Sequence, residues 1–285
     1  MTPLAKREAA TRLVTECGLS VHRACRIVRF SRAAYYRQGV SRLERDAPVI
    51  EALRRLVERH SKIGFWKSVD RLHRRGYPWN PKRIYRVYRA LGLNQARRTK
   101  RRVPTRLRQP LAAVQLLNVT WAMDFMSDAF YGGRKFRVLN AIDEGNREVL
   151  AIEPATSIPT ARVLRVLNEL VQMHGAPAAL RVDNGPEFTS GDFVEWCGER
   201  GIEIRFIQPG KPDQNAFIER FNRTYREGVL DTYLFASIEE VKAVSAEWME
   251  DYNWERPHDS LGRVPPLTFL PRPTASREST LQLST

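Results

Sequence analysis

Three acidic side chains, each inside its own distinctive segment, have the residue type that metal-dependent phosphoryl chemistry requires. Asp124 lies in Trp-Ala-Met-Asp-Phe, Asp183 in Arg-Val-Asp-Asn-Gly-Pro-Glu-Phe, and Glu219 in Gln-Asn-Ala-Phe-Ile-Glu-Arg-Phe-Asn-Arg. Hard divalent cations prefer oxygen ligands, and a pair of them can stabilise both oxygens of an in-line displacement at phosphorus. No His or Cys accompanies these acids in their segments. The sequence therefore predicts a site for two Mg²⁺ ions, for which Mn²⁺ is expected to substitute.

The elements that must position these acids are short strands and helices in the second half of the chain. Strands are expected over 120–126, 135–142, 148–152, 179–182 and 202–207, and helices over 160–174, 191–200 and 214–226. This order predicts a mixed α/β sheet, although other α/β folds share the pattern. Asp124 would then lie in mid-strand, and Asp183 at a strand end, where Asn-Gly-Pro turns the chain away. Asp143 falls in a hairpin turn, so a structural role is favoured for it.

The expected helix around Glu219 has a polar face and an adjoining apolar stripe. Its polar face contains Asn215, Glu219, Asn222 and Arg226, spaced by steps of four, three and four. Asn215 and Asn222 are either orienters of metal-bound water or DNA, or exposed polar residues. Arg220, Arg223 and Arg226 are predicted to contact DNA phosphates.

The front of the chain is strongly basic. Residues 1–110 hold 29 Lys and Arg against 7 Asp and Glu, whereas residues 111–285 hold 18 against 25. Such asymmetry indicates a nucleic-acid-binding region joined to a metal-dependent core. The alternative is a basic surface that is merely solvated. The basic residues predicted to contact DNA in this front part are Arg32, Arg37, Lys82, Arg83, Arg86, Arg97, Arg98, Lys100, Arg101 and Arg102.

The basic region divides into two helical units and a linker. Helices are expected over 4–17 and 21–28, with a third beginning at Ser31, and then over 49–60, 67–75 and 81–91. Gly18 suits a helix C-cap, Ser31 an N-cap and Pro81 a first helical position. The predicted divisions are 1–42, 43–93, a basic linker over 94–116, a catalytic core over 117–270 and a disordered tail over 271–285.

The motifs resemble the DDE transposases and retroviral integrases, most closely the second-reading-frame transposase of the insertion-sequence-three family. The likeness includes Gly210-Lys-Pro-Asp-Gln-Asn through Arg226 and the closing Tyr252-Asn-Trp-Glu-Arg-Pro-His-Asp-Ser-Leu-Gly262. It implies a ribonuclease-H-like core behind helix-turn-helix units, with Asp124, Asp183 and Glu219 as catalytic metal ligands. It also implies cleavage and joining of DNA, a homo-multimer that holds DNA ends, and fusion or partnership with an upstream reading-frame product.

Other function classes are less consistent with the composition. Three scattered cysteines and no apolar run long enough to cross a bilayer predict a cytoplasmic protein without membrane insertion. The resemblance implies a bacterial, DNA-associated protein. Two rival functions remain open: a nuclease that only hydrolyses, and a catalytically inactive helix-turn-helix regulator. Asp128, Glu187 and Asp213 are expected to tune the site, and His258 to be structural.

Overall fold

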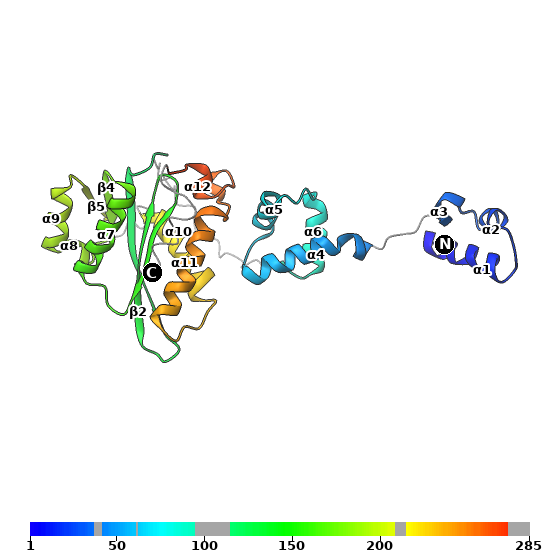
Figure 1. The fold of residues 1–285 in the computed structure, drawn as a ribbon, viewed down its shortest axis with the longest axis horizontal. Helices are drawn as coiled ribbons and strands as arrows, with labels where there is room; N and C mark the ends of the chain where they lie inside the picture. Colours follow the sequence, from blue (N-terminus) through cyan, green and yellow to red (C-terminus); the bar gives the residue numbers. More distant parts are fainter. Residues whose placement is uncertain (37–41, 61, 95–114, 209–214, 273–285) are drawn as a thin grey trace, which may run out of the picture. The chain divides into compact units, whose positions relative to one another are not determined.

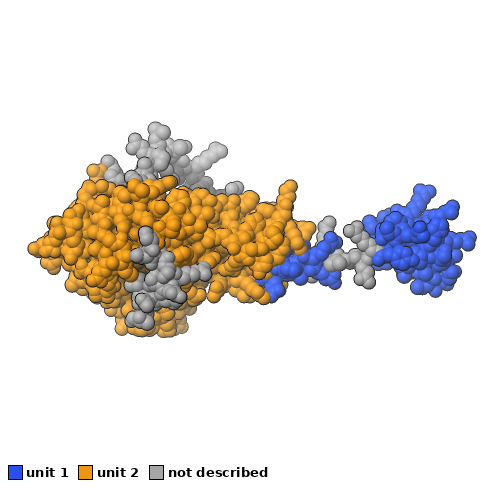
Figure 2. All heavy atoms as spheres, turned by 45° about the horizontal axis from the view of Figure 1, so that its top comes forward, with its two compact units in different colours: residues 1–51 blue, residues 52–285 orange. Residues whose placement is uncertain are grey.

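A computed structural model describes residues 1–36, 42–60, 62–94, 115–208 and 215–272 of the chain (Figure 1). The chain separates into two compact units, residues 1–51 and residues 52–285, which Figure 2 colours differently. None of the helices in the described ranges has both the length and the apolar character needed to cross a bilayer.

The first unit contains the three helices expected at the N-terminus. They are α1 (Pro3–Thr15), α2 (Val21–Ile27) and α3 (Arg32–Tyr36). The hydroxyl of Ser31 accepts a hydrogen bond from the Ala34 amide at 3.1 Å, which is the predicted N-cap contact. Gly18 follows α1 with a φ of 63°, the left-handed conformation that glycine adopts at low cost. Local signals therefore account for these helix ends.

The second unit opens with a small helical region. It contains the later part of α4 (Arg42–Arg59), whose earlier part belongs to the first unit, followed by α5 (Phe65–Arg74) and α6 (Pro81–Ala90). Pro81 occupies the first position of α6, as expected, and the Asn80 side chain accepts from the Lys82 amide at 2.8 Å. The expectation that α4 begins at residue 49 was wrong, because the helix continues through Pro48. A proline disfavours a helical residue before it, and here the helix forms in spite of that local preference.

The second half of the chain is built on a five-stranded mixed sheet. Its strands are β1 (Thr120–Ala129), β2 (Lys135–Asp143), β3 (Val149–Ala155), β4 (Ala179–Val182) and β5 (Glu203–Phe206). The spatial order is β3-β2-β1-β4-β5, in which β1 to β3 pair antiparallel and β4 lies parallel to both β1 and β5. The expected α/β order is confirmed.

Helices cover both faces of this sheet (Figure 1). One face packs on α7 (Thr160–His174), α8 (Pro186–Thr189) and α9 (Gly191–Glu199). The other packs on α10 (Ala216–Tyr225), the π-helix η2 (Arg226–Leu230) and α11 (Ile238–Trp254). On β1, Trp121 and Met123 join the first core, while Ala122 and Met126 join the second. Asp124 has the same parity as Ala122 and Met126, so the alternation of strand side chains turns it toward α10.

The chain after α11 folds back against the sheet-containing part of the second unit. It forms the short helices η3 (Asp259–Leu261) and α12 (Pro266–Phe269). The expected core boundary at residue 270 leaves out Arg272, which is only 5% exposed and pairs with Asp143 and Glu148, each at 2.5 Å. An arginine that is buried and paired with two buried acids belongs to the packed interior. The rest of the predicted tail, 273–285, lies outside the described residues.

Ion pairs join α5 to α11 and to the segment after it. The Arg71 guanidinium donates to both carboxylate oxygens of Asp251, at 2.6 and 2.5 Å, and is only 1% exposed. Arg263 makes a second two-pronged contact with Asp70, at 2.7 and 2.9 Å. A buried guanidinium is stabilised only when its charge is compensated with good geometry. The small helical region and the sheet-containing region of this unit are therefore held together by specific ion pairs.

Candidate active site

Asp124 is held by the helix that carries Glu219. The Asn222 side-chain amide donates to Asp124 Oδ2 at 2.8 Å, and the Asn140 amide donates to Asn222 Oδ1 at 2.7 Å. Asn140 lies on β2 directly opposite Asp124 in the antiparallel register. The backbone amide of Phe125 donates to the other oxygen, Asp124 Oδ1, at 2.8 Å. This chain of buried amides sets the orientation of the Asp124 carboxylate.

Asp183 follows β4, which lies between its two parallel neighbours β1 and β5. Its Oδ1 accepts the Gly185 amide proton at 2.9 Å, which closes the tight turn predicted after this strand. A Cβ added at Gly185 would lie 2.9 Å from the same oxygen and 3.3 Å from Glu187 Oε2. Position 185 therefore has no room for a side chain while Asp183 keeps this orientation, and the turn leaves one carboxylate oxygen of Asp183 available.

Glu219 projects from the first turn of α10 and is exposed, whereas Ile218 and Phe221 of the same helix are buried. The start of the helix is further anchored by Phe217, whose ring lies 3.4 Å from the guanidinium carbon of Arg147. After Tyr225 the helix widens into the π-helix η2, a feature that often marks functional sites. Apolar packing thus holds the helix, and Glu219 stays accessible.

The charges of Asp183 and Glu219 act on Asp124. Burial raises the pKa of Asp124 to about 6, and the charges of Asp183 and Glu219 add to the rise against the hydrogen bonds from Phe125 and Asn222. Within the described residues none of the three acids makes an ion pair, and no three His, Cys, Asp or Glu side chains converge closely enough to hold a metal ion. The donor set itself is all carboxylate oxygen around a region of excess negative charge, which fits a hard divalent cation.

The asparagines predicted as orienters differ in their environments. Asn222 orients the Asp124 carboxylate directly, and it is buried, so the interpretation as an exposed polar residue was wrong for it. Asn215 is also buried, at the N-cap position of α10, and its Oδ1 has no hydrogen-bond partner among the described residues. Asn140 was missed by the sequence analysis, because only the strand register places it opposite Asp124.

The neighbouring acids have defined partners. Asp128 pairs with Arg226 at 3.2 Å, and Glu187 pairs with Arg137, whose guanidinium also lies over the Phe125 ring. These pairs border the site without belonging to the triad. Asp143 is fully buried in the β2–β3 turn and accepts from the Gly145 amide at 2.8 Å, which confirms its structural role. Asp213 lies outside the described residues.

The residues predicted to contact DNA are distributed over several surfaces. Arg32, Lys82, Arg86, Arg220 and Arg223 are exposed, whereas Arg83 is half-buried and Arg226 is engaged with Asp128. The remaining predicted contacts, Arg37, Arg97, Arg98, Lys100, Arg101 and Arg102, lie outside the described residues. The DNA contacts of all these residues stay predictions.

The segment from Tyr252 to Gly262 packs against the sheet and has a structural role. Asn253 is buried, and its side chain exchanges two hydrogen bonds of 2.9 Å with the backbone of Val149 on the edge strand β3. His258 packs edge-on against Tyr252, and burial lowers its pKa to about 3, so it is neutral near pH 7. These contacts agree with the structural role expected for His258.

The sequence matches three known domain models. An HTH-like domain matches residues 44–102, and integrase core domains match residues 117–212 and 200–266. A protein of insertion element IS476 from Xanthomonas euvesicatoria is 39% identical over 94% of this chain and 78% of its own length. A protein of insertion element IS407 from Burkholderia multivorans is 34% identical over 92% of this chain and 94% of its own length.

Among solved structures, the HTLV-2 integrase catalytic core domain in complex with magnesium is similar to 53% of this chain and 96% of that chain, with 17% identity and a TM-score of 0.44. The two insertion-element relatives span both the HTH-like region and the integrase core of the present chain. On the strength of those relatives and the matched domains, this chain belongs to the insertion-element transposases that carry an integrase core domain.

Proposed function

We propose that the transposase cuts and joins DNA strands with two Mg²⁺ ions held by Asp124, Asp183 and Glu219. The observation that carries this proposal is the hydrogen bond from Asn222 to Asp124, because it ties the helix of Glu219 to the strand of Asp124. Asp183 directly follows β4, the parallel neighbour of the strand that carries Asp124, and its charge acts on Asp124. The three acids therefore come from elements that are held together independently of any ligand.

The chain's own groups supply orientation in this reaction. When bound, the metal ions would activate an oxygen nucleophile and stabilise the leaving oxygen. Asn222 and the Phe125 amide fix the direction of the Asp124 carboxylate, and the Gly185 amide fixes that of Asp183. No covalent attachment of DNA to the protein is required, because water or a DNA 3′-hydroxyl serves as the nucleophile.

Joining rather than hydrolysis depends on how the DNA end is held. Two metal ions can activate any oxygen nucleophile, so a DNA 3′-hydroxyl outcompetes water only when protein surface fixes it near the target phosphate. The HTH-like region, the basic linker over 94–116 and the exposed Arg220 and Arg223 are suited to that task. A multimer that holds two element ends, and participation of an upstream reading-frame product, belong to the same proposal.

Substitution of the triad tests the metal site. We expect Asp124→Asn, Asp183→Asn and Glu219→Gln each to abolish cleavage in Mg²⁺ while binding to DNA in gel-shift assays persists. Asp192→Asn is the matched control, since Asp192 is an exposed acid on α9, on the opposite face of the sheet. Cleavage that survives in any triad variant would remove that residue from the proposed site.

A strand-transfer assay separates transposition from simple hydrolysis. Element-end DNA with a labelled free 3′-hydroxyl is incubated with Mg²⁺ and target DNA, with the upstream frame's product absent and then present. We expect joined products in at least one condition. If bound DNA gives only shortened strands in both, the protein acts as a nuclease.

A further inference from the structure

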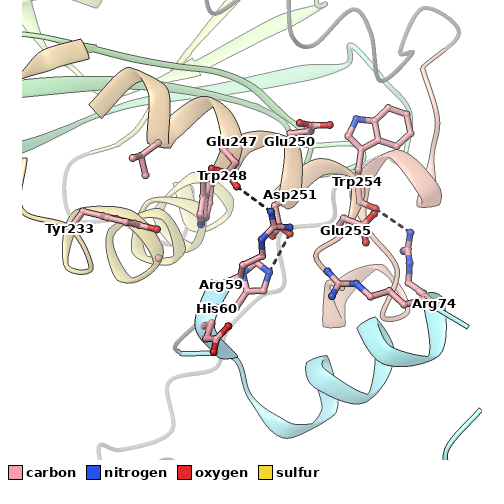
Figure 3. A pocket seen from close by; sticks show the side chains of 14 residues that line it. Arg59, His60, Arg74, Tyr233, Glu247, Trp248, Glu250, Asp251, Trp254 and Glu255 are labelled. Atoms are coloured by element: carbon pink, nitrogen blue, oxygen red, sulfur yellow. Dashed lines mark hydrogen bonds and ion pairs between the residues drawn. The ribbon is translucent and has the colours of Figure 1, made fainter. Parts of the chain in front are cut away.

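Two cavities flank the contact between Arg71 and Asp251, and they differ in charge. The first, drawn in Figure 3, has a volume of about 560 Å³ and is lined by five carboxylates and three guanidinium groups. Arg59 lies 3.8 Å from Glu247 there, and Arg74 donates to the Trp254 carbonyl. Its carboxylates outnumber its guanidinium groups. This first cavity has no excess positive charge that would require an anion.

The second cavity, of about 580 Å³, lies between α5 and the flank of α10. Seven Lys and Arg side chains line it against three carboxylates, those of Glu58, Glu227 and Asp259. Three of its cations have acidic partners outside the lining: Arg59 with Glu247, Lys62 with Asp231 and Arg71 with Asp251. Among the described residues the other four make no ion pair: Lys67, Arg220, Arg223 and Arg256. We call Lys67, Arg220, Arg223 and Arg256 the basic pocket.

The cations of the basic pocket are close enough to disfavour one another's charge. Burial and then the charge of Arg256 lower the pKa of Lys67 to about 8, and Arg220 and Arg71 act in the same direction. Burial also lowers the pKa of Arg256, with the Arg71 charge contributing. Positive charges held together without full compensation are costly to the fold. A bound anion would relieve that cost.

The basic pocket borders the catalytic helix. Arg223 follows Glu219 by four positions, so these two side chains are neighbours on the surface of α10. Arg220 and Thr224 continue around the helix into the cavity. A DNA strand with one phosphate at the acids can therefore pass over Arg223 and place a neighbouring phosphate beside Lys67.

Salt bridges hold the opposite wall of the pocket in place. Lys67 is on α5, which is joined to the catalytic unit through the pairs of Arg71 with Asp251 and Arg263 with Asp70. Arg256 follows directly after α11, which carries Asp251. Residues from the HTH-like region and from the integrase core thus contribute to one pre-formed cavity, whose volume is within the range of about 300–1,000 Å³ of ligand sites.

We propose that the basic pocket binds a backbone phosphate of the DNA strand that runs across α10 to the triad, and that Lys67 and Arg256 are positioning residues for that strand. This inference rests on the proposed function for the identity of the ligand. It adds a site shared by the HTH-like region and the core, in which Lys67 and Arg256, absent from the predicted DNA contacts, join the predicted contacts Arg220 and Arg223. DNA bound in the basic pocket would contact both the HTH-like region and the integrase core. These two contacts would fix the position of the strand relative to Asp124, Asp183 and Glu219.

The test measures binding of the full chain to a short mixed-sequence DNA duplex over a series of salt concentrations, in the absence of divalent cations. We expect Lys67→Gln and Arg220→Gln each to weaken binding and to reduce the slope of log affinity against log salt by about 1. Arg256→Gln should do the same, and Arg256→Lys should restore most of the slope. The matched control is Lys242→Gln, a neutralised exposed lysine on α11 that does not line the pocket.

Lys67 and Arg220 variants are informative even if Arg256→Gln fails to fold, because their side chains are partly or fully exposed. Slopes for Lys67→Gln and Arg220→Gln that coincide with the slope for Lys242→Gln would overturn the inference. Inorganic phosphate that binds the wild type and not Lys67→Gln, with unchanged DNA slopes, would also overturn it and indicate a free small anion. The assay measures DNA binding and not cleavage. Its outcome can therefore be interpreted even if the proposed metal chemistry of the triad is wrong.

Discussion

Two sets of acids carried by the sheet and by the segments next to it have opposite environments. At the β2–β3 turn, Asp143 and Glu148 are buried, and Arg272 contacts both at 2.5 Å while also donating to Asn118. We call Asp143, Glu148 and Arg272 the closed cluster. We call Asp124, Asp183 and Glu219 the open cluster: Asp124 and Asp183 accept hydrogen bonds from amides, and none of the three makes an ion pair within the described residues.

The contrast shows how one residue type serves two purposes. In the closed cluster every charge has a fixed partner, so its energy contributes to folding. In the open cluster amides orient Asp124 and Asp183, and no cation within the described residues compensates the repulsion of Asp124 by the other two charges; perturbed carboxyls of this kind are typical of functional sites. The predictions below test that distinction.

The largest effect is expected from breaking the closed cluster. Arg272→Met leaves two buried carboxylates without a cation, and removing one partner of a buried ion pair costs about 3–5 kcal/mol. The free energy of unfolding, measured with urea, should fall by that amount. Asp183→Asn serves as the comparison, since it alters an open-cluster acid. A loss no greater than that of a surface substitution would show that Arg272 is not part of the fold.

Breaking the orientation of the open cluster should cost less. Asn222→Ala removes the hydrogen bond to Asp124 and leaves the buried Asn140 amide without its acceptor. The free energy of unfolding should fall by about 1–3 kcal/mol. Cleavage should decrease at temperatures where the variant is folded, while DNA affinity is retained. Asn168→Ala is the control, because Asn168 accepts from Trp196 on the other face of the sheet. Equal cleavage by the two variants would contradict the orienting role.

Neutralising one open-cluster acid should not destabilise the protein. Asp183→Asn retains an oxygen for the Gly185 amide and removes a charge that disfavours ionised Asp124. We expect stability to be unchanged or to increase by up to about 1 kcal/mol, as occurs when function opposes stability. Thermal unfolding alongside a cleavage assay measures both properties. A clear decrease in stability would place Asp183 with the structural acids.

A smaller effect is expected from the pH dependence around the closed cluster. Burial, and then the charge of Arg272, lower the pKa of His174 to about 4, below its unfolded value of about 6.5. The unfolded chain therefore takes up a proton first, and stability present above pH 6.5 is lost as the pH falls toward 4. His174→Gln should show a shallower decline in unfolding temperature over this range. Parallel declines in the two proteins would exclude this contribution.

Local patterns in the sequence determined most of the elements. The helix over Thr160–His174 and the strand over Ala179–Val182 were predicted with the observed bounds, because apolar periodicity and turn residues act within a few positions. Asp143 was assigned to a turn for the same reason. The start of α4 was not predictable locally, because the helix forms through Pro48 against a local preference.

The partners of the functional residues were decided by the tertiary structure. Asn140 meets Asp124 only through the register of β1 and β2, and Asn222 reaches it from a helix far along the chain. Arg71 and Asp251, 180 positions apart, meet through packing of α5 near α11. The sequence by itself determined which residue types are available and the elements that carry them. Only the tertiary structure decided which carboxylates gained a cation and which remained without one, because long-range register and packing set those distances.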